Sequence, residues 1–350
     1  MADKKIAHIQ RPCDTFVVEY PEFIDLLKRQ EETFWTFDET NPENDKHDLL
    51  VNMTEAERHG VTTTLKTFTL LEKVIGGDFW QNFVCKRFPR EADIIPMATM
   101  FSAMELAVHE RFYATINETM GLATEEFYDE YKYDPVLKSR IDSMMETLSH
   151  KDDLRTIGGF SFFEGAILFS SFAFLKSFQL NGNNKILNIV AGLNFTCRDE
   201  MLHCDAAAAL YRVLKAQQLE LGIIDEQFVE ELERDIVKAG RDVYEHELLL
   251  LDKLFEKGDI EGMSKGDIAA FVRHRVNECL RKLDIEPIYD ESYNPLAKPF
   301  YDSITGYSST DFFSSQGSQY KRGWSEEKFK MGKGKKKVTE AETETGTGAQ

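Results

Sequence analysis

The chain of 350 residues is 42% hydrophobic and 29% charged, so it is long enough to bury a large core, as an ordinary globular protein does. Its net charge of −19 disfavours a nucleic-acid partner, and its five scattered cysteines form no Cys-x-x-Cys pair, which argues against a disulfide framework or a structural zinc site. Because the first residues lack a secretory signal and no run has the length of a membrane span, we expect a cytoplasmic protein without a membrane partner.

Apolar residues recur at helical spacing from Pro21 to about Leu280, and strand-like alternation is scarce, so the sequence predicts an all-α fold. An N-terminal extension over residues 1–19 precedes a helical bundle domain over residues 20–293. The predicted helices are Tyr20–Thr33, Thr54–Gly76, Ile94–Met120, Asp134–Leu148, Phe160–Phe178, Lys185–Gln217, Asp225–Leu254 and Lys265–Leu283. The predicted helix stops are Gly76-Gly77, Gly121, Asn181-Gly182-Asn183-Asn184 and Gly258.

The most apolar segment, Phe160–Leu175, contains Glu164, which indicates a buried core helix with one carboxylate rather than a membrane span. After about Asn294 the helical periodicity ends. We expect residues 294–323 to be an extended tail segment, and residues 324–350, where large apolar residues nearly vanish, to be a disordered charged tail.

Four of the predicted helices carry a glutamate where a core residue is expected, and two of these helices add a histidine on the same face. His109 lies about 40° around the helix from Glu105, and His203 about 60° from Glu200. The other two carboxylates are Glu72 and Glu164. Singly, each is more easily explained as a solvated or arginine-paired residue. Their joint occurrence on four helices favours a dinuclear metal site, because two divalent cations would cancel the buried charge.

Oxygen and imidazole donors without thiolate suit iron or manganese. Other kinds of catalytic site lack their motifs. The pairs His109-Glu110 and His246-Glu247 have no second histidine four residues on, as a zinc protease requires, and the chain has no P-loop, no Gly-x-Gly-x-x-Gly and no Gly-x-Ser-x-Gly.

The segment from Arg198 to Asp205, Arg-Asp-Glu-Met-Leu-His-Cys-Asp, closely resembles the signature of the small (beta) subunit of class I ribonucleotide reductases, and the similarity extends from about Pro21 to about Tyr320. The resemblance implies a ferritin-like helical bundle with additional helices, a flexible C-terminal tail and two metal ions per chain. The implied ligands are Glu72, Glu105 and His109 for the first metal and Glu164, Glu200 and His203 for the second, with carboxylates bridging.

One spacing departs from the family pattern. The family usually places its first histidine three residues after the glutamate, whereas Glu105 and His109 are four apart and Leu106 takes the usual ligand position. Both spacings share a helical face, so we expect a local adjustment such as a π-bulge to restore the geometry.

The resemblance also implies four residues that generate or carry a radical. Tyr113, one turn beyond His109, matches the tyrosine that is oxidised. Trp35 and Asp199 match an electron relay toward the first histidine. Tyr320 matches the tail tyrosine that passes the radical to the large subunit, although the charged end of this chain differs from the usual apolar anchor.

The implied function is the radical-generating subunit of ribonucleotide reductase, a homodimer active only with a large (alpha) subunit that reduces ribonucleotides to deoxyribonucleotides. The metal pair is expected to be di-iron, with manganese–iron or di-manganese pairs left open. A di-metal oxidase or desaturase would use the same ligands without Trp35, Tyr320 or the tail. An iron-storage bundle would be a shorter chain without a radical tyrosine.

Overall fold

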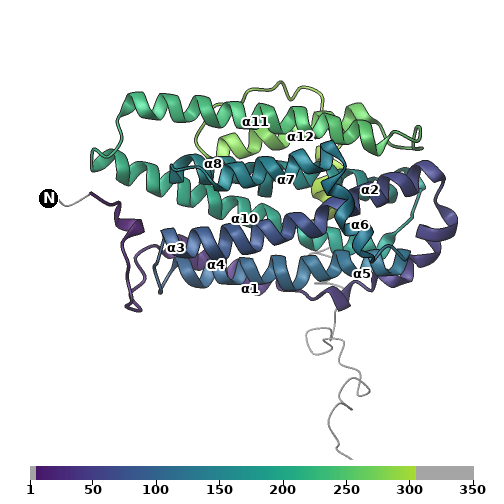
Figure 1. The fold of residues 1–350 in the computed structure, drawn as a ribbon, viewed down its shortest axis with the longest axis horizontal. Coiled ribbons are helices and arrows are strands. Elements are labelled where there is room, and N and C mark those ends of the chain that lie inside the picture. Colours follow the sequence, from purple (N-terminus) through teal and green to yellow (C-terminus); the bar gives the residue numbers. More distant parts are fainter. Residues whose placement is uncertain (1–4, 305–350) are drawn as a thin grey trace, which may run out of the picture.

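The computed structural model describes residues 5–304, the side chains at 69–70 and 180–182 excepted. Four long helical rods form the centre of the molecule and run roughly along its long axis (Figure 1). In chain order they are α2 (Glu55–Glu72) with η5 (Lys73–Val84) and α3 (Cys85–Arg87); α4 (Ile94–Met104) with η6 (Glu105–His109) and α5 (Glu110–Met120); α8 (Asp153–Phe162) with η8 (Phe163–Ile167) and α9 (Leu168–Lys176); and α10 (Leu187–Glu220). In the first three rods the middle segment is π-helical.

Further helices cover this centre, and α1 packs on α4 while α11 packs on both α8 and α12. They are α1 (Pro21–Glu32), α6 (Glu125–Asp129), α7 (Pro135–Leu148), α11 (Glu226–Leu254) and α12 (Lys265–Lys282). Short 3-10 or π turns complete the described part: η1 (His8–Gln10), η2 (Phe37–Glu39), η3 (Pro42–Asp45), η4 (Asp48–Asn52), η7 (Glu130–Lys132) and η9 (Ser177–Gly182). Within residues 5–304 the strand-like pairing is limited to an isolated bridge between Cys13 and Arg90, so the described chain is all-α as predicted.

Several helices begin at a side chain that satisfies their first backbone amides. Asp134 accepts hydrogen bonds from the amides of Val136 and Leu137, and Pro135 occupies the first position of α7, where its missing N–H is no loss. Asp225 and Ser264 cap α11 and α12 in the same way. These local signals explain why the predicted starts of these helices agree with the structure.

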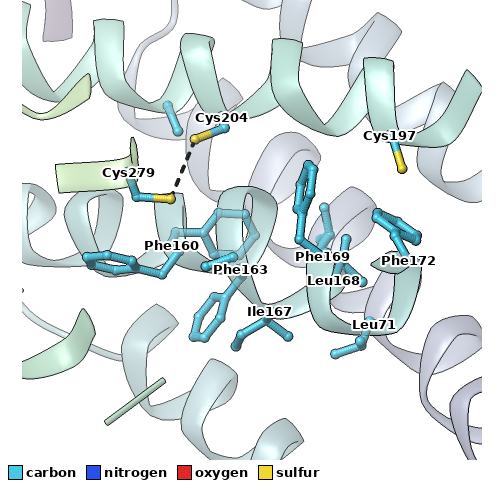
Figure 2. Packing of buried hydrophobic residues seen from close by; sticks show 14 of the residues in the cluster. Leu71, Phe160, Phe163, Ile167, Leu168, Phe169, Phe172, Cys197, Cys204 and Cys279 are labelled. Atoms are coloured by element: carbon cyan, nitrogen blue, oxygen red, sulfur yellow. Dashed lines mark hydrogen bonds between the residues drawn. The ribbon is translucent and has the colours of Figure 1, made fainter. Parts of the chain in front are cut away.

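The third rod is the apolar core of the bundle. Residues Asp153–Gln179 are long and apolar enough to cross a membrane, but the most apolar stretch of 18 residues within them is 100% buried inside the protein, so the rod is a core helix as predicted. Phenylalanine and aliphatic side chains project from it into the surrounding helices, among them Phe160, Phe163 and Ile167 (Figure 2). Glu164 is thus the acidic residue of an otherwise apolar stretch of this rod, and it is fully buried.

Two predicted helix boundaries are wrong. The glycines Gly76 and Gly77 do not end the first rod, which continues through η5 and α3 to Arg87. A Cβ added at Gly76 would lie 2.7 Å from Cβ of Glu105, so this glycine permits two rods to approach closely rather than ending a helix. The third rod begins at Asp153 instead of Phe160, because Asp152 accepts a hydrogen bond from the amide of Arg155 and caps it there.

The start of the predicted tail is folded. Residues 297–304 are helical, and Phe300 and Ile304 are buried. Phe300 contacts Phe271 on α12 with a ring-centroid distance of 4.6 Å. The expected extended segment therefore does not begin at residue 294, and the remainder of the predicted tail, with Tyr320, lies outside the described residues.

Candidate metal centre

The π-helical turn η6 brings Glu105 and His109 together. It spans the four-residue interval that departs from the family spacing, which confirms the expected local adjustment. Nδ1 of His109 lies 2.9 Å from Oε2 of Glu105. Both side chains are fully buried and point into the space between the rods.

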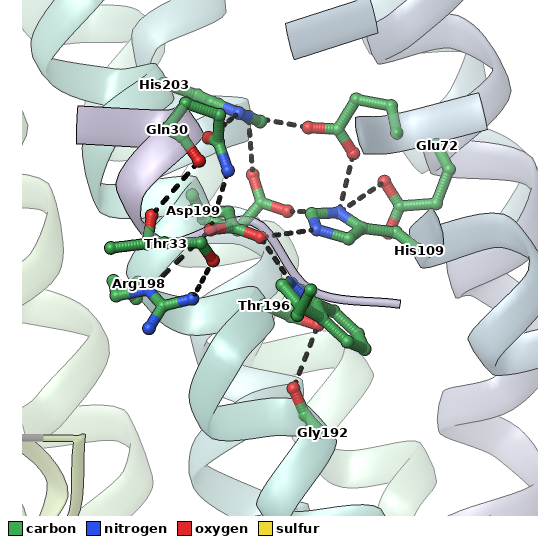
Figure 3. A network of polar contacts seen from close by, with 12 residues as sticks. Gln30, Thr33, Glu72, His109, Gly192, Thr196, Arg198, Asp199 and His203 are labelled. Carbon is green, nitrogen blue, oxygen red and sulfur yellow. Dashed lines mark hydrogen bonds and ion pairs between the residues drawn. The ribbon is translucent and has the colours of Figure 1, made fainter. Parts of the chain in front are cut away.

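The other predicted ligands converge on the same place from the remaining rods. Glu200 and His203 come from α10, Glu72 from the end of α2 and Glu164 from η8. Two overlapping groups have donor atoms within 4.8 Å of one another: Glu72, Glu105, His109 and Glu200; and Glu105, Glu164, Glu200 and His203. Because Glu105 and Glu200 belong to both groups, their carboxylates lie where bridging ligands would be needed. Figure 3 shows part of this arrangement, with His109 and His203 on opposite sides.

The donor atoms fit divalent cations. All six side chains are fully buried. Within the described part of the chain, both oxygens of Glu72 and Oε2 of Glu164 have no hydrogen-bond partner, and the oxygens of Glu200 have ion-pair contacts with His109 and His203 alone, at 3.2 Å and 3.6 Å. Buried carboxylate oxygens are rarely left without partners, since each costs desolvation free energy. A pair of metal ions would satisfy these atoms, and the oxygen and imidazole donor set suits iron or manganese.

The electrostatics of the cluster agree with this interpretation. Burial, and then the charge of Glu105, raises the pKa of Glu72 well above its ordinary value. Burial and the charge of Glu200 do the same to the pKa of Glu164. Burial and the neighbouring charges therefore favour the protonated form of these two carboxyls, and metal binding would release their protons.

Glu105 behaves in the opposite way. Burial disfavours its charged form, but His109 and His203 outweigh that effect and hold its pKa well below the ordinary value. Burial likewise opposes protonation of His203, but the neighbouring carboxylates, Glu105 first, raise its pKa to about 9. Each histidine directs Nδ1 toward the carboxylates, which leaves Nε2 free for an outer partner.

Two residues that contact the proposed ligands from outside the cluster, Gln30 and Trp80, were not expected from the sequence. Nε2 of His203 lies 3.2 Å from Oε1 of Gln30, and Gln30 donates from Nε2 to Oδ1 of Asp199 over 3.0 Å. Trp80 donates its indole N–H to Oε1 of Glu164 over 2.7 Å. Partners of this kind fix the orientation of metal ligands. Neither residue carries a local signal, because each reaches its partner from a distant part of the chain.

Trp35 and Asp199 lie beside His109. Trp35 donates its indole N–H to Oδ2 of Asp199 over 2.7 Å, and the same oxygen lies 3.1 Å from Nε2 of His109. Trp35 also stacks on the His109 ring, with centroids 5.9 Å apart. A continuous set of contacts therefore connects the indole to the candidate metal centre.

Tyr113 is fully buried in an aromatic pocket. Phe68 lies against its ring at a centroid distance of 4.4 Å, and Phe112 at 5.4 Å. Its phenol oxygen has no hydrogen-bond partner among the described residues. Burial, followed by the charges of Glu72 and Glu200, raises its pKa well above the ordinary value, which also shows that the phenol lies near the carboxylate cluster. Tyr113 is therefore a neutral phenol shielded from water.

The bundle and its cluster of carboxylates and histidines define a ferritin-like protein with a dinuclear metal site. The sequence profile of the family described as "Ribonucleotide reductase, small chain" matches residues 13–295, and the chain belongs to that family. It is accordingly the radical-generating beta subunit of a class I ribonucleoside-diphosphate reductase.

Relatives with this description are distant in sequence. The chain is 25% identical over 325 residues to "Probable ribonucleoside-diphosphate reductase small subunit 048L" of Invertebrate iridescent virus 3, covering 86% of this chain and 82% of the relative. It is 22% identical over 312 residues to a ribonucleoside-diphosphate reductase small subunit of Dictyostelium discoideum, covering 87% and 85%.

Solved structures show the same fold. The dimanganese(II)-NrdF of Streptococcus sanguinis aligns with a TM-score of 0.70 at 20% identity, over 84% of this chain and 99% of that one. A putative class I ribonucleotide reductase from Bacillus halodurans aligns with a TM-score of 0.71 at 20% identity, over 82% and 100%. The predicted ferritin-like helical bundle is thereby confirmed.

Proposed function

We propose that the six buried side chains hold two metal ions and that the radical made by this subunit is stored on Tyr113. The proposed ligands are Glu72, Glu105, His109, Glu164, Glu200 and His203. One observation carries the proposal: carboxylate oxygens without hydrogen-bond partners converge in the described core, near a buried phenol that also lacks a partner there. Such an arrangement is costly for a protein without cations and has a direct use in one that oxidises a tyrosine.

The proposed metal pair is di-iron first, with manganese–iron and di-manganese as alternatives. Oxygen and nitrogen donors accept either metal, and the Streptococcus sanguinis relative is a dimanganese(II) protein. When bound, the metals would supply the oxidising equivalent that removes an electron from the phenol of Tyr113.

Tyr113 itself must lose a proton together with that electron. Its raised pKa means that the phenol is protonated at neutral pH, so a neutral radical requires a nearby base. The carboxylates of Glu72 and Glu200 are the charged groups whose effect on Tyr113 is strongest, which makes them the candidate acceptors. The rings of Phe68 and Phe112 exclude water and reductants from the product.

Outward transfer is proposed through Trp35 and Asp199. Asp199 accepts a hydrogen bond from the indole of Trp35 and contacts Nε2 of His109, so the carboxylate can hold a proton while an electron moves along the stacked rings. The last proposed carrier in this chain is Tyr320, outside the described residues, which would pass the radical to the large subunit.

The partners follow from this role. We propose a cytoplasmic homodimer that associates with a large subunit carrying the nucleotide site. The structure of Rnr4 from Saccharomyces cerevisiae, which aligns with a TM-score of 0.63 at 16% identity, is that of a homodimer.

Reconstitution followed by electron paramagnetic resonance tests the proposal. Metal-free protein is loaded with ferrous or manganous ion and exposed to oxygen, with and without an added reductant or peroxide. We expect a tyrosyl signal in wild type that disappears in Tyr113→Phe while metal content is retained. Tyr211→Phe is the matched control, because Tyr211 is also buried, with a phenol unpartnered among the described residues, but lies apart from the carboxylate cluster. A signal that survives Tyr113→Phe, or is lost equally in Tyr211→Phe, removes Tyr113 from the proposal.

A second measurement tests transfer. With a large subunit added, Tyr320→Phe should retain the radical signal and lose ribonucleotide reduction. Retained turnover would remove Tyr320 from the pathway.

A further inference from the structure

A pair of buried thiols lies behind the candidate metal centre. Cys204 on α10 and Cys279 on α12 bring their Sγ atoms to 4.0 Å, and both side chains are fully buried (Figure 2). The two sulfurs are thus nearly in van der Waals contact although 75 positions separate them in the sequence. By contrast, Cys13 and Cys85 are partly exposed.

The third rod forms a fitted recess for both sulfurs. A Cβ added at Gly165 would lie 2.3 Å from Sγ of Cys279 and 2.7 Å from Sγ of Cys204, so the sulfurs occupy the space that a side chain would need. Both thiols also face the backbone carbonyl of Ser161, at 3.6 Å for Cys204 and 3.5 Å for Cys279. The recess therefore holds the two thiols against each other.

We propose that Cys204 and Cys279 form a redox-active dithiol that a peroxide converts reversibly into a disulfide linking α10 to α12. One sulfur attacks the O–O bond of hydrogen peroxide, which gives a sulfenic acid and one water. The second thiol then displaces the hydroxyl group from that sulfur, which forms the S–S bond and releases a second water. Two thiols lose two electrons and two protons, and one peroxide is reduced to two waters.

The geometry requires only a small movement. A disulfide bond is about 2.05 Å long, so the sulfurs must approach by roughly 2 Å, which side-chain rotation and a slight helix shift can supply. Two thiols held side by side favour the disulfide over further oxidation, because the second thiol captures the sulfenic acid.

The disulfide has a consequence for the metal centre. Cys204 directly follows His203, and Gly165 directly follows Glu164, so a movement of the sulfurs reaches one proposed ligand on each of two rods. We therefore expect the disulfide form to bind metal more weakly than the dithiol. This second step rests on the proposed function, whereas formation of the disulfide does not.

Peptide mapping tests the disulfide. Reduced, metal-free full-length protein is treated with hydrogen peroxide, blocked with an alkylating agent and digested. We expect a peptide joined through Cys204 and Cys279 as the main cross-link, a loss of two of the five thiols, and recovery of both with dithiothreitol. Cys204→Ser and Cys279→Ser should each abolish that cross-link, whereas Cys13→Ser and Cys85→Ser should leave it unchanged.

The peptide map of the wild-type protein tests the disulfide even if a serine variant fails to fold. Cross-links that avoid Cys204 and Cys279, or independent oxidation of these two to sulfinic acids, would overturn the proposal.

Metal affinity tests the coupling. Manganous ion is titrated into the dithiol and disulfide forms of the wild-type protein, and bound metal is measured after equilibrium dialysis. We expect at least tenfold weaker binding by the disulfide form, restored by dithiothreitol. Equal affinity in the two forms would overturn the coupling. Absence of binding in both forms would overturn the proposed metal centre and leave the disulfide standing.

Discussion

Trp80 donates its indole N–H to Glu164 across 2.7 Å, from one rod of the bundle to another. This bond uses Oε1 of the carboxylate and leaves Oε2 without a partner in the described part of the chain. The indole therefore fixes which oxygen of Glu164 faces the metal centre, and the third rod cannot rotate without breaking the bond.

Replacing Trp80 with phenylalanine should weaken metal binding. The ring that packs against Phe79 and Phe101 would be kept in part, but Glu164 would lose its donor. Loss of an outer partner typically lowers metal affinity by about 10- to 100-fold. Equilibrium dialysis with manganous ion measures the change, and thermal unfolding of the metal-free protein provides the control for packing. Unchanged affinity would show that Glu164 is oriented by packing alone.

Metal affinity should also depend on Gln30, and two variants can separate its role as acceptor for His203 from its role as donor to Asp199. Gln30→Leu removes both the acceptor for His203 and the donor to Asp199, and should lower affinity by about tenfold or more. Gln30→Glu keeps an acceptor for His203 but places a second carboxylate against Asp199. We expect Gln30→Glu to retain more affinity than Gln30→Leu and to perturb the pH dependence of radical transfer. Equal losses in the two variants would contradict the role assigned to the acceptor.

The adjacent glycines of the first rod offer a matched pair of substitutions. In Gly76→Ala the new methyl group would lie 2.7 Å from Cβ of Glu105 and 2.9 Å from Cγ of Leu106, whereas Gly77→Ala would meet nothing within 4 Å. Overpacking of this kind costs about 1–3 kcal/mol, whereas alanine at an open helical position is neutral or stabilising. Chemical denaturation should therefore separate the two variants, and Gly76→Ala should also reduce metal content. Similar stabilities would mean that the rods can move apart freely.

Burial of Arg140 and Glu247 leads to a stability prediction. Their side chains are 0% exposed and 2.6 Å apart, with Glu247 also accepting from Ser170. Removing one partner leaves the other charge uncompensated, so Glu247→Ala should lower the free energy of unfolding by about 3–5 kcal/mol. The double variant Arg140→Met with Glu247→Leu should recover most of this loss. Asp142→Ala, which breaks an exposed pair with Lys138, should stay within about 1 kcal/mol of wild type.

Lys176 should make stability depend on pH. Burial lowers its pKa from 10.5 to about 8, although its ammonium group donates to the carbonyl of Phe300 and lies 3.8 Å from that ring. Because the pKa is lower in the folded state, the unfolded state binds more protons between pH 8 and 10.5, and stability should rise with pH across that window.

The variant Lys176→Met checks this assignment. The free energy of unfolding of this variant should not rise with pH, and at pH 7 it should exceed that of wild type by up to about 3 kcal/mol. Urea unfolding of wild type and variant from pH 7 to 10.5 measures the free energy of unfolding across this range. Parallel pH profiles for the two proteins would exclude a buried ammonium at this position.

Helical periodicity predicts the bundle and the four rods because amphipathic spacing is a local property of the sequence. The same applies to the ligand pairs, since Glu105 with His109 and Glu200 with His203 each lie on one turn. Contacts between rods are not local. Gln30 reaches Asp199 across 169 positions and Trp80 reaches Glu164 across 84, and no spacing rule indicates such pairs.

The role of Gly76 is one that the sequence does not predict, although Gly121 ends α5 as predicted. A Gly-Gly pair commonly ends a helix, yet at Gly76 the absent side chain accommodates a neighbouring rod, which becomes visible only when the rods are packed. The helix at residues 297–304 escapes prediction for a related reason, because its stability comes from Phe300 packing on α12 rather than from its own composition.

The turn η6 has a consequence for how this chain tolerates insertions and deletions. A π-turn closes its hydrogen bonds over five residues instead of four, so it absorbs one additional residue without displacing the helix on either side. Deleting Leu106 would restore a three-residue interval and convert the turn to ordinary α-helix, with the imidazole and carboxylate still on one face. A one-residue change in length, ordinarily disruptive inside a core helix, is thus neutral in principle at this turn of the second rod.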